Sequence, residues 1–124
     1  MLTVLLVDDH DGFRRAAREL LETGPFTVVL EAADVAGARA VLDGSCGDVV
    51  RPDVALIDIG LPDGDGFQLA TWLESHSPET TVVMVSSRSR VEVSLRMSAS
   101  CAAGFIPKDE LTPQVLANVL RCTT

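Results

Sequence analysis

Residues 1–9 read MLTVLLVDD, an apolar run that meets two aspartates at positions 8 and 9. The run is nearly continuous and does not alternate with polar residues, which is typical of a strand buried on both faces of a parallel sheet. It lacks the basic leader of a signal peptide, and no apolar run in the sequence approaches the length that crosses a bilayer. We therefore expect a buried first strand in a cytoplasmic protein with no membrane partner.

Four more short apolar runs follow, and segments with helical periodicity separate them. In the first such segment, apolar residues at positions 13, 16, 17, 20 and 21 form one stripe of a helix that ends near Gly24-Pro25. The alternation predicts an α/β fold whose parallel strands are joined by right-handed crossovers. The expected strands are residues 2–7, 27–30, 54–57, 80–85 and 104–106. The expected helices are residues 13–21, 35–42, 67–73, 91–103 (where strand-like alternation competes) and 111–120.

The composition fits a single domain that does not bind nucleic acid by itself. The 124 residues are enough for one hydrophobic core, so we expect residues 1–124 to form one domain. Eighteen acidic and ten basic residues give a formal net charge of −8, which repels a phosphate backbone. The three cysteines, Cys46, Cys101 and Cys122, lack metal-site spacing, and we expect free thiols.

Chemically distinctive side chains stand where the expected strands end. Asp8 and Asp9 follow the first strand, Asp58 the third, Ser86 the fourth and Lys108 the fifth. Because the carboxyl ends of parallel strands share one edge of a sheet, and open α/β sheets bind ligands at that edge, these side chains should converge. The sequence thus predicts a site of three carboxylates, a hydroxyl and a lysine.

Three carboxylates in contact destabilise a fold unless a cation neutralises them. Oxygen ligands of this kind suit Mg2+, which commonly uses one or two carboxylates and keeps several waters. We predict Asp9 and Asp58 as direct ligands, Asp8 either as a ligand through water or as a residue just outside the ligands, and the backbone carbonyl of Gly60 as a further ligand. His10 is expected to be an exposed residue and not a ligand.

The same cluster suits phosphoryl transfer to a carboxylate. Asp58 can act as the nucleophile and form an acyl phosphate. Lys108 and the Ser86 hydroxyl, with Ser87 as the alternative hydroxyl, can stabilise the charge on the phosphoryl oxygens. The sequence contains neither GxxxxGK[ST] nor GxGxxG, so we expect the donor to be a phosphorylated group on another molecule.

Four separated motifs resemble those of response-regulator receiver domains, in the order and approximate spacing of that family. They are VDDHDGF at residues 7–13, DIGLPDGDGFQL at 58–69, VVMVSS at 82–87 and GFIPK at 104–108. The resemblance implies a flavodoxin-like, doubly wound (βα)5 fold with a five-stranded parallel sheet in the order 2-1-3-4-5. The K-D junction at Lys108 and the LPDGDG segment look like the NarL/LuxR-type subfamily.

The resemblance also implies roles for single residues. Asp58 matches the phosphoacceptor, Asp8 and Asp9 the acidic pair that holds Mg2+, Gly60 the carbonyl ligand, Ser86 the switch hydroxyl, Lys108 the family's lysine, and Phe105 the aromatic that responds to phosphorylation. The implied protein is a phosphoacceptor and not a conventional enzyme. Its donor is a sensor histidine kinase or a phosphotransfer protein.

The implied output is a change in the face formed by the fourth helix, the fifth strand and the fifth helix. That face would form a phosphorylation-dependent homodimer or bind a partner, and transcription would be controlled through a DNA-binding domain outside this sequence. Two departures from the family pattern stand out: Pro107 precedes Lys108, where the family often has proline after the lysine, and Ser100-Cys101 replaces a common Ala-Gly.

Two other functions compete with this interpretation. A degenerate receiver would act as a phosphorylation-independent interaction module. An aspartyl phosphatase of the haloacid dehalogenase kind would need a second acid two residues after its nucleophile, and Gly60 stands there.

Overall fold

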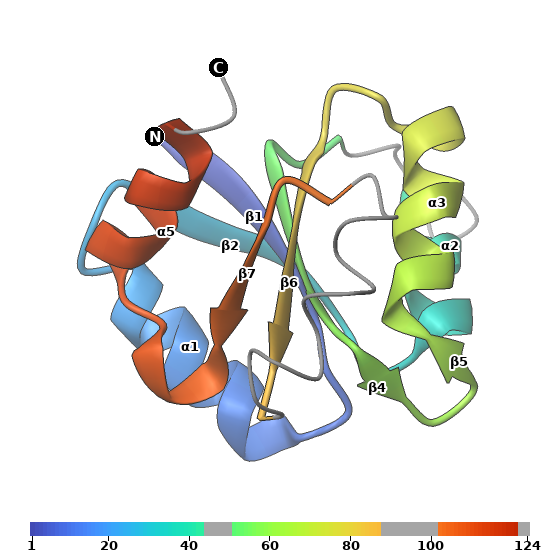
Figure 1. Ribbon diagram of the computed structural model, residues 1–124, viewed down its shortest axis with the longest axis horizontal. Helices are drawn as coiled ribbons and strands as arrows, with labels where there is room; N and C mark the ends of the chain where they lie inside the picture. The colour runs from blue at the N-terminus through green and yellow to red at the C-terminus, as the bar shows by residue number, and fades with distance from the viewer. Residues whose placement is uncertain (44–50, 88–101, 122–124) are drawn as a thin grey trace.

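The sheet has the strand order that the resemblance implied. In the computed structural model, which describes residues 1–43, 51–87 and 102–121, five parallel strands form one sheet in the order β2-β1-β3-β6-β7 (Figure 1). Taken in chain order, these are the first to fifth strands of the sheet, so the order 2-1-3-4-5 is confirmed. The strands are β1 (Leu2–Val7), β2 (Phe26–Ala32), β3 (Val54–Asp58), β6 (Thr81–Ser86) and β7 (Gly104–Pro107).

Helices follow the strands as expected, with shifted ends. They are α1 (Asp11–Leu21), α2 (Val35–Leu42), α3 (Gly66–His76) and α5 (Pro113–Arg121), with a 3-10 turn, η1 (Lys108–Glu110), before α5. The last helix begins two residues later than predicted, because the Thr112 hydroxyl accepts a hydrogen bond from Val115 N–H and caps it there. None of the helices in these described ranges is long and apolar enough to span a membrane.

The predicted helix over residues 91–103 falls outside the described residues except at its end. Ala102 and Ala103 are not helical, so the prediction extended too far. The physical reason is that Ala103 N–H donates to Val82 O at 2.7 Å and already belongs to the sheet. The departure at Ser100-Cys101 and all three cysteines also fall outside the described residues.

The sheet is covered on both faces, which explains its nearly continuous apolar strands. Helices α1 and α5 lie on one side of the sheet, and α2 and α3 lie on the other (Figure 1). In β1, Val4 and Leu6 belong to the buried cluster on the α1 and α5 side, whereas Leu5 and Val7 belong to the cluster on the α2 and α3 side. Successive residues therefore face opposite layers, and both layers are apolar.

The strand register aligns the ends of the strands. Val7 lies beside Ile57, so the next residues, Asp8 and Asp58, are level with each other. Ser86 in turn lies beside Pro107. Because β7 is an edge strand, the missing N–H of its proline interrupts no ladder on the outer side.

The loop after β3 forms a small antiparallel hairpin. Its strands are β4 (Gly60–Leu61) and β5 (Gly64–Asp65), and α3 follows at once. Asp65 caps the start of that helix: its carboxylate accepts a hydrogen bond from Phe67 N–H at 2.8 Å, and it also forms a capping box with Gln68. Between hairpin and helix, Gly66 N–H donates to Ile59 O at 2.9 Å.

We predict that Gly66→Ala destabilises the protein by roughly 1–3 kcal/mol, the usual cost of overpacking. An added Cβ would lie 2.3 Å from the carbonyl oxygen of Asp58 and 2.9 Å from Met84 Cε, and the backbone atom cannot move away cheaply. Urea unfolding measures the change. The matched control is Gly12→Ala on exposed α1, where nothing lies within 4 Å and stability should be unchanged or slightly higher. Equal stability of the two variants would contradict the prediction.

Candidate functional site

The carboxylates predicted to converge do meet at the carboxyl edge of the sheet. Asp8, Asp9, Asp58 and His10 each place one potential ligand atom within 4.8 Å of the others. Asp8 and Asp58 are 1% and 6% exposed, whereas Asp9 lies at the surface. Two buried acids therefore face each other beneath one exposed acid.

Lys108, the first residue of η1 directly after β7, joins this cluster, as the sequence predicted. Its Nζ lies 2.6 Å from Asp8 Oδ2 and 3.5 Å from Asp58 Oδ2, and its side chain is 15% exposed. The ammonium group also lies 4.7 Å from the centroid of the Phe13 ring, which gives it a cation–π contact. A single lysine thus stands between the two buried carboxylates.

Burial and charge leave Asp58 easier to protonate than an ordinary aspartate. Burial raises the pKa of its carboxyl most strongly, and the Asp8 carboxylate raises it further. Lys108 and the Gly60 N–H, which lies 3.4 Å from Asp58 Oδ1, lower that pKa, but the net direction is upward. The positive charge supplied by the described residues is therefore too small for the negative charge they bury.

The donor set fits a hard divalent cation such as Mg2+. Asp8 Oδ2 is fully buried and has no hydrogen-bond partner among the described residues, because the nearby lysine is not in hydrogen-bonding geometry. A buried carboxylate oxygen without a directed partner is costly, and a cation would satisfy it. Gly60 is exposed at the start of the hairpin, two residues after Asp58, and its N–H lies 3.4 Å from Asp58 Oδ1.

His10 is exposed, as predicted, but it is closer to the acids than the sequence suggested. Its side chain is 68% exposed, and its Nδ1 lies 3.1 Å from Asp8 Oδ1 and 3.2 Å from Asp9 Oδ1. Its backbone N–H also donates to Asp8 Oδ1 at 2.8 Å. The residue therefore braces the acidic turn from the surface.

Arg14 holds that turn in place, a role that was not predicted from the sequence. The Arg14 guanidinium on α1 donates to the backbone carbonyl of Asp8 and to the Asp11 carboxylate, and its Nε donates to Glu31 Oε1 on β2 at 3.2 Å. Arg18, one helical turn later, also pairs with Glu31, at 3.0 Å. An arginine one turn after His10 was the available signal, but its partner 17 residues away is set by the tertiary fold.

The other predicted residues lie around the cluster. Ser86 is buried as the last residue of β6, whereas Ser87 is exposed and lines an open hollow beside Asp9 and Lys108. Phe105 on β7 is half-buried and packs against the cluster on the α2 and α3 side. The position of Phe105 is compatible with a switch and with a plain core residue.

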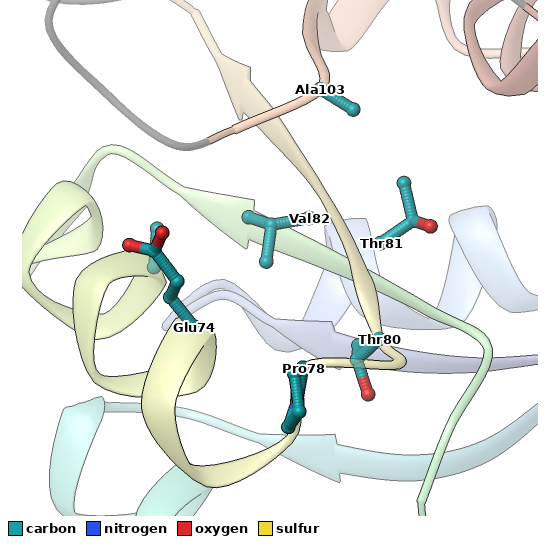
Figure 2. A pocket seen from close by; sticks show the side chains of 7 residues that line it. Glu74, Pro78, Thr80, Thr81, Val82 and Ala103 are labelled. Atoms are coloured by element: carbon teal, nitrogen blue, oxygen red, sulfur yellow. The ribbon is translucent and has the colours of Figure 1, made fainter. Parts of the chain in front are cut away.

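A separate cavity of about 270 Å³ lies away from the acids. It opens at the amino end of β6 (Figure 2), whereas the acidic cluster lies at the carboxyl edge of the sheet. Its lining offers one charged group, on α3, beside two threonines and apolar side chains. The lining residues are Ala70, Glu74, Pro78, Thr80, Thr81, Val82 and Ala103.

Comparison with known proteins identifies the family. The model of the response regulator receiver domain matches residues 4–121. The chain is 38% identical over 110 residues to the DNA-binding transcriptional activator DevR/DosR of Mycobacterium tuberculosis, which covers 88% of this chain and 48% of that protein. It is 33% identical over 120 residues to the probable transcriptional regulatory protein NarL of the same organism, covering 96% of this chain and 53% of that protein.

A solved structure agrees with the sequence relatives. The signal receiver domain of NarL from Mycobacterium tuberculosis superimposes with a TM-score of 0.80 and 31% identity, covering 98% of this chain and 95% of that one. The chain spans about half the length of the two curated relatives. Fold, family match and relatives agree with the four sequence motifs, and the chain belongs to the response regulator receiver domain family, with NarL-type transcription regulators among its relatives.

Proposed function

We propose that Asp58 accepts a phosphoryl group from a phosphohistidine on a sensor kinase or phosphotransfer protein. A carboxylate oxygen of Asp58 forms a bond to phosphorus, the phosphorus–nitrogen bond of the donor breaks, and the imidazole leaves. The observation that carries the proposal is the buried Asp8 and Asp58 pair with Lys108 between them. Residues 1–124 act in this proposal as one receiver domain.

Mg2+ supplies positive charge for the phosphoryl oxygens when it is bound, and Asp8, Asp9, Asp58 and the Gly60 carbonyl would hold it. The raised pKa of Asp58 supports this assignment, as does the buried Asp8 Oδ2, which pairs with the Lys108 ammonium group but accepts no hydrogen bond among the described residues. The protein is thus a phosphoacceptor rather than a conventional enzyme. In this proposal, cleavage of the donor's phosphorus–nitrogen bond drives the transfer, and no nucleotide takes part.

Lys108 and Ser86 are the proposed donors to the phosphoryl group. The lysine amine already lies 3.5 Å from Asp58 Oδ2, so a short movement brings it to a phosphoryl oxygen. Ser86 ends the strand beside β3, at the same edge, and its hydroxyl supplies a neutral donor. Ser87 is the alternative, and its exposure at the open hollow makes it less suited to a buried phosphoryl group.

The proposed output is transcription control through a DNA-binding domain outside this sequence. The relatives are named as transcription regulators, and this chain matches about half of each. With a net charge of −8, the receiver domain by itself is expected to bind DNA poorly. The predicted output face comprises the fourth helix, which lies outside the described residues, β7 with Phe105, and α5. Phosphorylation would shift this face and so favour a homodimer or a partner. Such a regulator would work in the cytoplasm, where the DNA lies.

The first prediction concerns phosphorylation itself. Incubation with acetyl phosphate and Mg2+ should add one phosphoryl group, seen as one mass increment in intact mass spectrometry. Asp58→Asn should remain unmodified, and EDTA should abolish the gain in the wild type, because the attacking carboxylate and the cation are both needed. Modification of Asp58→Asn would place the acceptor elsewhere. No gain, together with no Mg2+ binding, would favour the phosphorylation-independent interaction module.

The second prediction concerns stability without the cation. Folding raises the pKa of Asp58. At pH values between the pKa of the unfolded chain and that of the native state, the native carboxyl therefore keeps a proton that the unfolded chain has lost. The free energy of unfolding should therefore fall as pH rises from the ordinary value of 3.8 through the raised pKa. Asp58→Asn removes this loss and should be more stable than the wild type at neutral pH in EDTA, by roughly 1 kcal/mol.

Urea unfolding at several pH values in EDTA measures this difference. The advantage of Asp58→Asn should grow across the same pH range and shrink when Mg2+ is added, because the cation neutralises the wild-type cluster. Asp109→Asn, an exposed acid next to Lys108, is the matched control and should show little change. A wild type as stable as Asp58→Asn throughout this pH range would contradict the raised pKa of Asp58.

A further inference from the structure

The hairpin after Asp58 is tied at its tip to a helix from another part of the chain. The Asp63 carboxylate accepts hydrogen bonds from Val35 N–H at 2.8 Å and from Ala36 N–H at 3.0 Å, the first two residues of α2. The helix also has its own N-cap, because Asp34 accepts a hydrogen bond from Gly37 N–H at 2.6 Å. Asp63 is thus a second acid at the same helix end, supplied from 27 and 28 residues away.

Charge strengthens this connection. An anion at a helix N-terminus interacts favourably with the helix dipole, and hydrogen bonds to a carboxylate are stronger than neutral ones. The hydrogen bonds from Val35 and Ala36 lower the pKa of Asp63, so the group stays ionised at neutral pH. The connection is therefore intact under the conditions in which the site works.

Packing reinforces the same contact. An added Cβ at Gly64 would lie 3.2 Å from Val35 Cγ2, so the hairpin backbone lies directly against the first residue of α2. Leu61, on the other strand of the hairpin, is buried in the same apolar cluster as Val35. The hairpin is thus docked on α2 by one apolar side chain, one close backbone approach and one carboxylate.

These contacts connect the acid that follows β1, Asp8, with the acid that ends β3, Asp58. Asp8 N–H donates to Ala32 O at 3.0 Å, and Ala32 leads through two residues into α2. From α2 the connection runs through Asp63 and the hairpin to Gly60, whose N–H faces Asp58 Oδ1. The acids of β1 and β3 are therefore linked outside the sheet as well as within it.

Gly60 needs such support because, among the described residues, its backbone forms strand pairing only with the hairpin's own Asp65 and no side chain packs where a Cβ would stand. No atom would lie within 4 Å of a Cβ at this exposed position. Its place depends on the rest of the hairpin, which is held at its base by the Gly66-to-Ile59 hydrogen bond and at its tip by Asp63. Loss of the tip contact would let the Gly60 carbonyl drift relative to Asp58.

We propose that Asp63 is a positioning residue that anchors the hairpin to α2 and thereby keeps the Gly60 carbonyl aligned with Asp58 for the cation. This inference rests on the proposed Mg2+ site. Asp63 does not touch the cation in this role; it acts through the hairpin. Residues that orient metal ligands from outside commonly change metal affinity by about tenfold or more.

The test compares Mg2+ affinity, measured by isothermal titration calorimetry, in the wild type and three variants. Asp63→Ala removes the anchor and should weaken Mg2+ binding by roughly tenfold. Asp34→Ala is the matched control, since it removes one carboxylate from the same helix end without freeing the hairpin, and it should stay within about twofold of wild type. Asp63→Asn has the charge of the alanine variant but keeps an acceptor oxygen, so it should recover much of the affinity.

The outcomes separate the two proposals. Mg2+ binding by the wild type with equal affinity in Asp63→Ala and Asp34→Ala would overturn the anchor and leave the cation site standing. Equal weakening in Asp63→Ala, Asp63→Asn and Asp34→Ala would show a general charge effect and also overturn it. Failure of the wild type to bind Mg2+ would overturn the cation site and the anchor together. Thermal unfolding checks that each variant is folded. Asp63→Ser, whose shorter side chain loses the same two hydrogen bonds, replaces Asp63→Ala if the alanine variant does not fold.

Discussion

The rest of this structure depends on two buried carboxylates that share one lysine. Asp8 and Asp58 are held in a low-dielectric edge of the sheet, where unpaired charge is costly. Lys108 cannot satisfy both equally, as its distances of 2.6 and 3.5 Å show. Asp58 has the longer contact with the lysine, and the pKa of its carboxyl is raised, so keeping this carboxyl ionised costs free energy. A site built in this way is poised to take up positive charge.

The sheet prevents the two acids from relieving that cost by moving apart. Their strands are adjacent and in register, and each strand is held between apolar layers on both faces. Displacing either acid by more than a small distance would disturb close packing, which interiors resist. Rigid packing in the sheet thus sustains an unfavourable charge arrangement at its edge, and strain of this kind is typical of functional sites.

Much of the fold and the centre of the site could be predicted from the sequence, because both depend on local patterns. Continuous apolar runs indicate doubly covered strands, and the residues after them must share an edge; this is how Asp8, Asp58 and Lys108 were found. The Arg14 contacts and the Asp63 anchor escaped prediction because their partners lie on other elements, 17 to 28 residues away. Gly and Pro in residues 60–66 are typical of a turn, but they do not indicate that the resulting hairpin contacts α2.

The supports of the site come from both layers of the protein, and this bears on how a change at Asp58 could spread. Arg14 on α1 holds the Asp8 carbonyl from one face of the sheet, while α2 holds the hairpin after Asp58 from the other (Figure 1). Lys108 stands apart from both, because it begins η1, directly between β7 and α5. A new negative group on Asp58 would compete with Asp8 for this lysine. Since the acids are fixed on both sides, the lysine and the segment that carries it are the part free to respond.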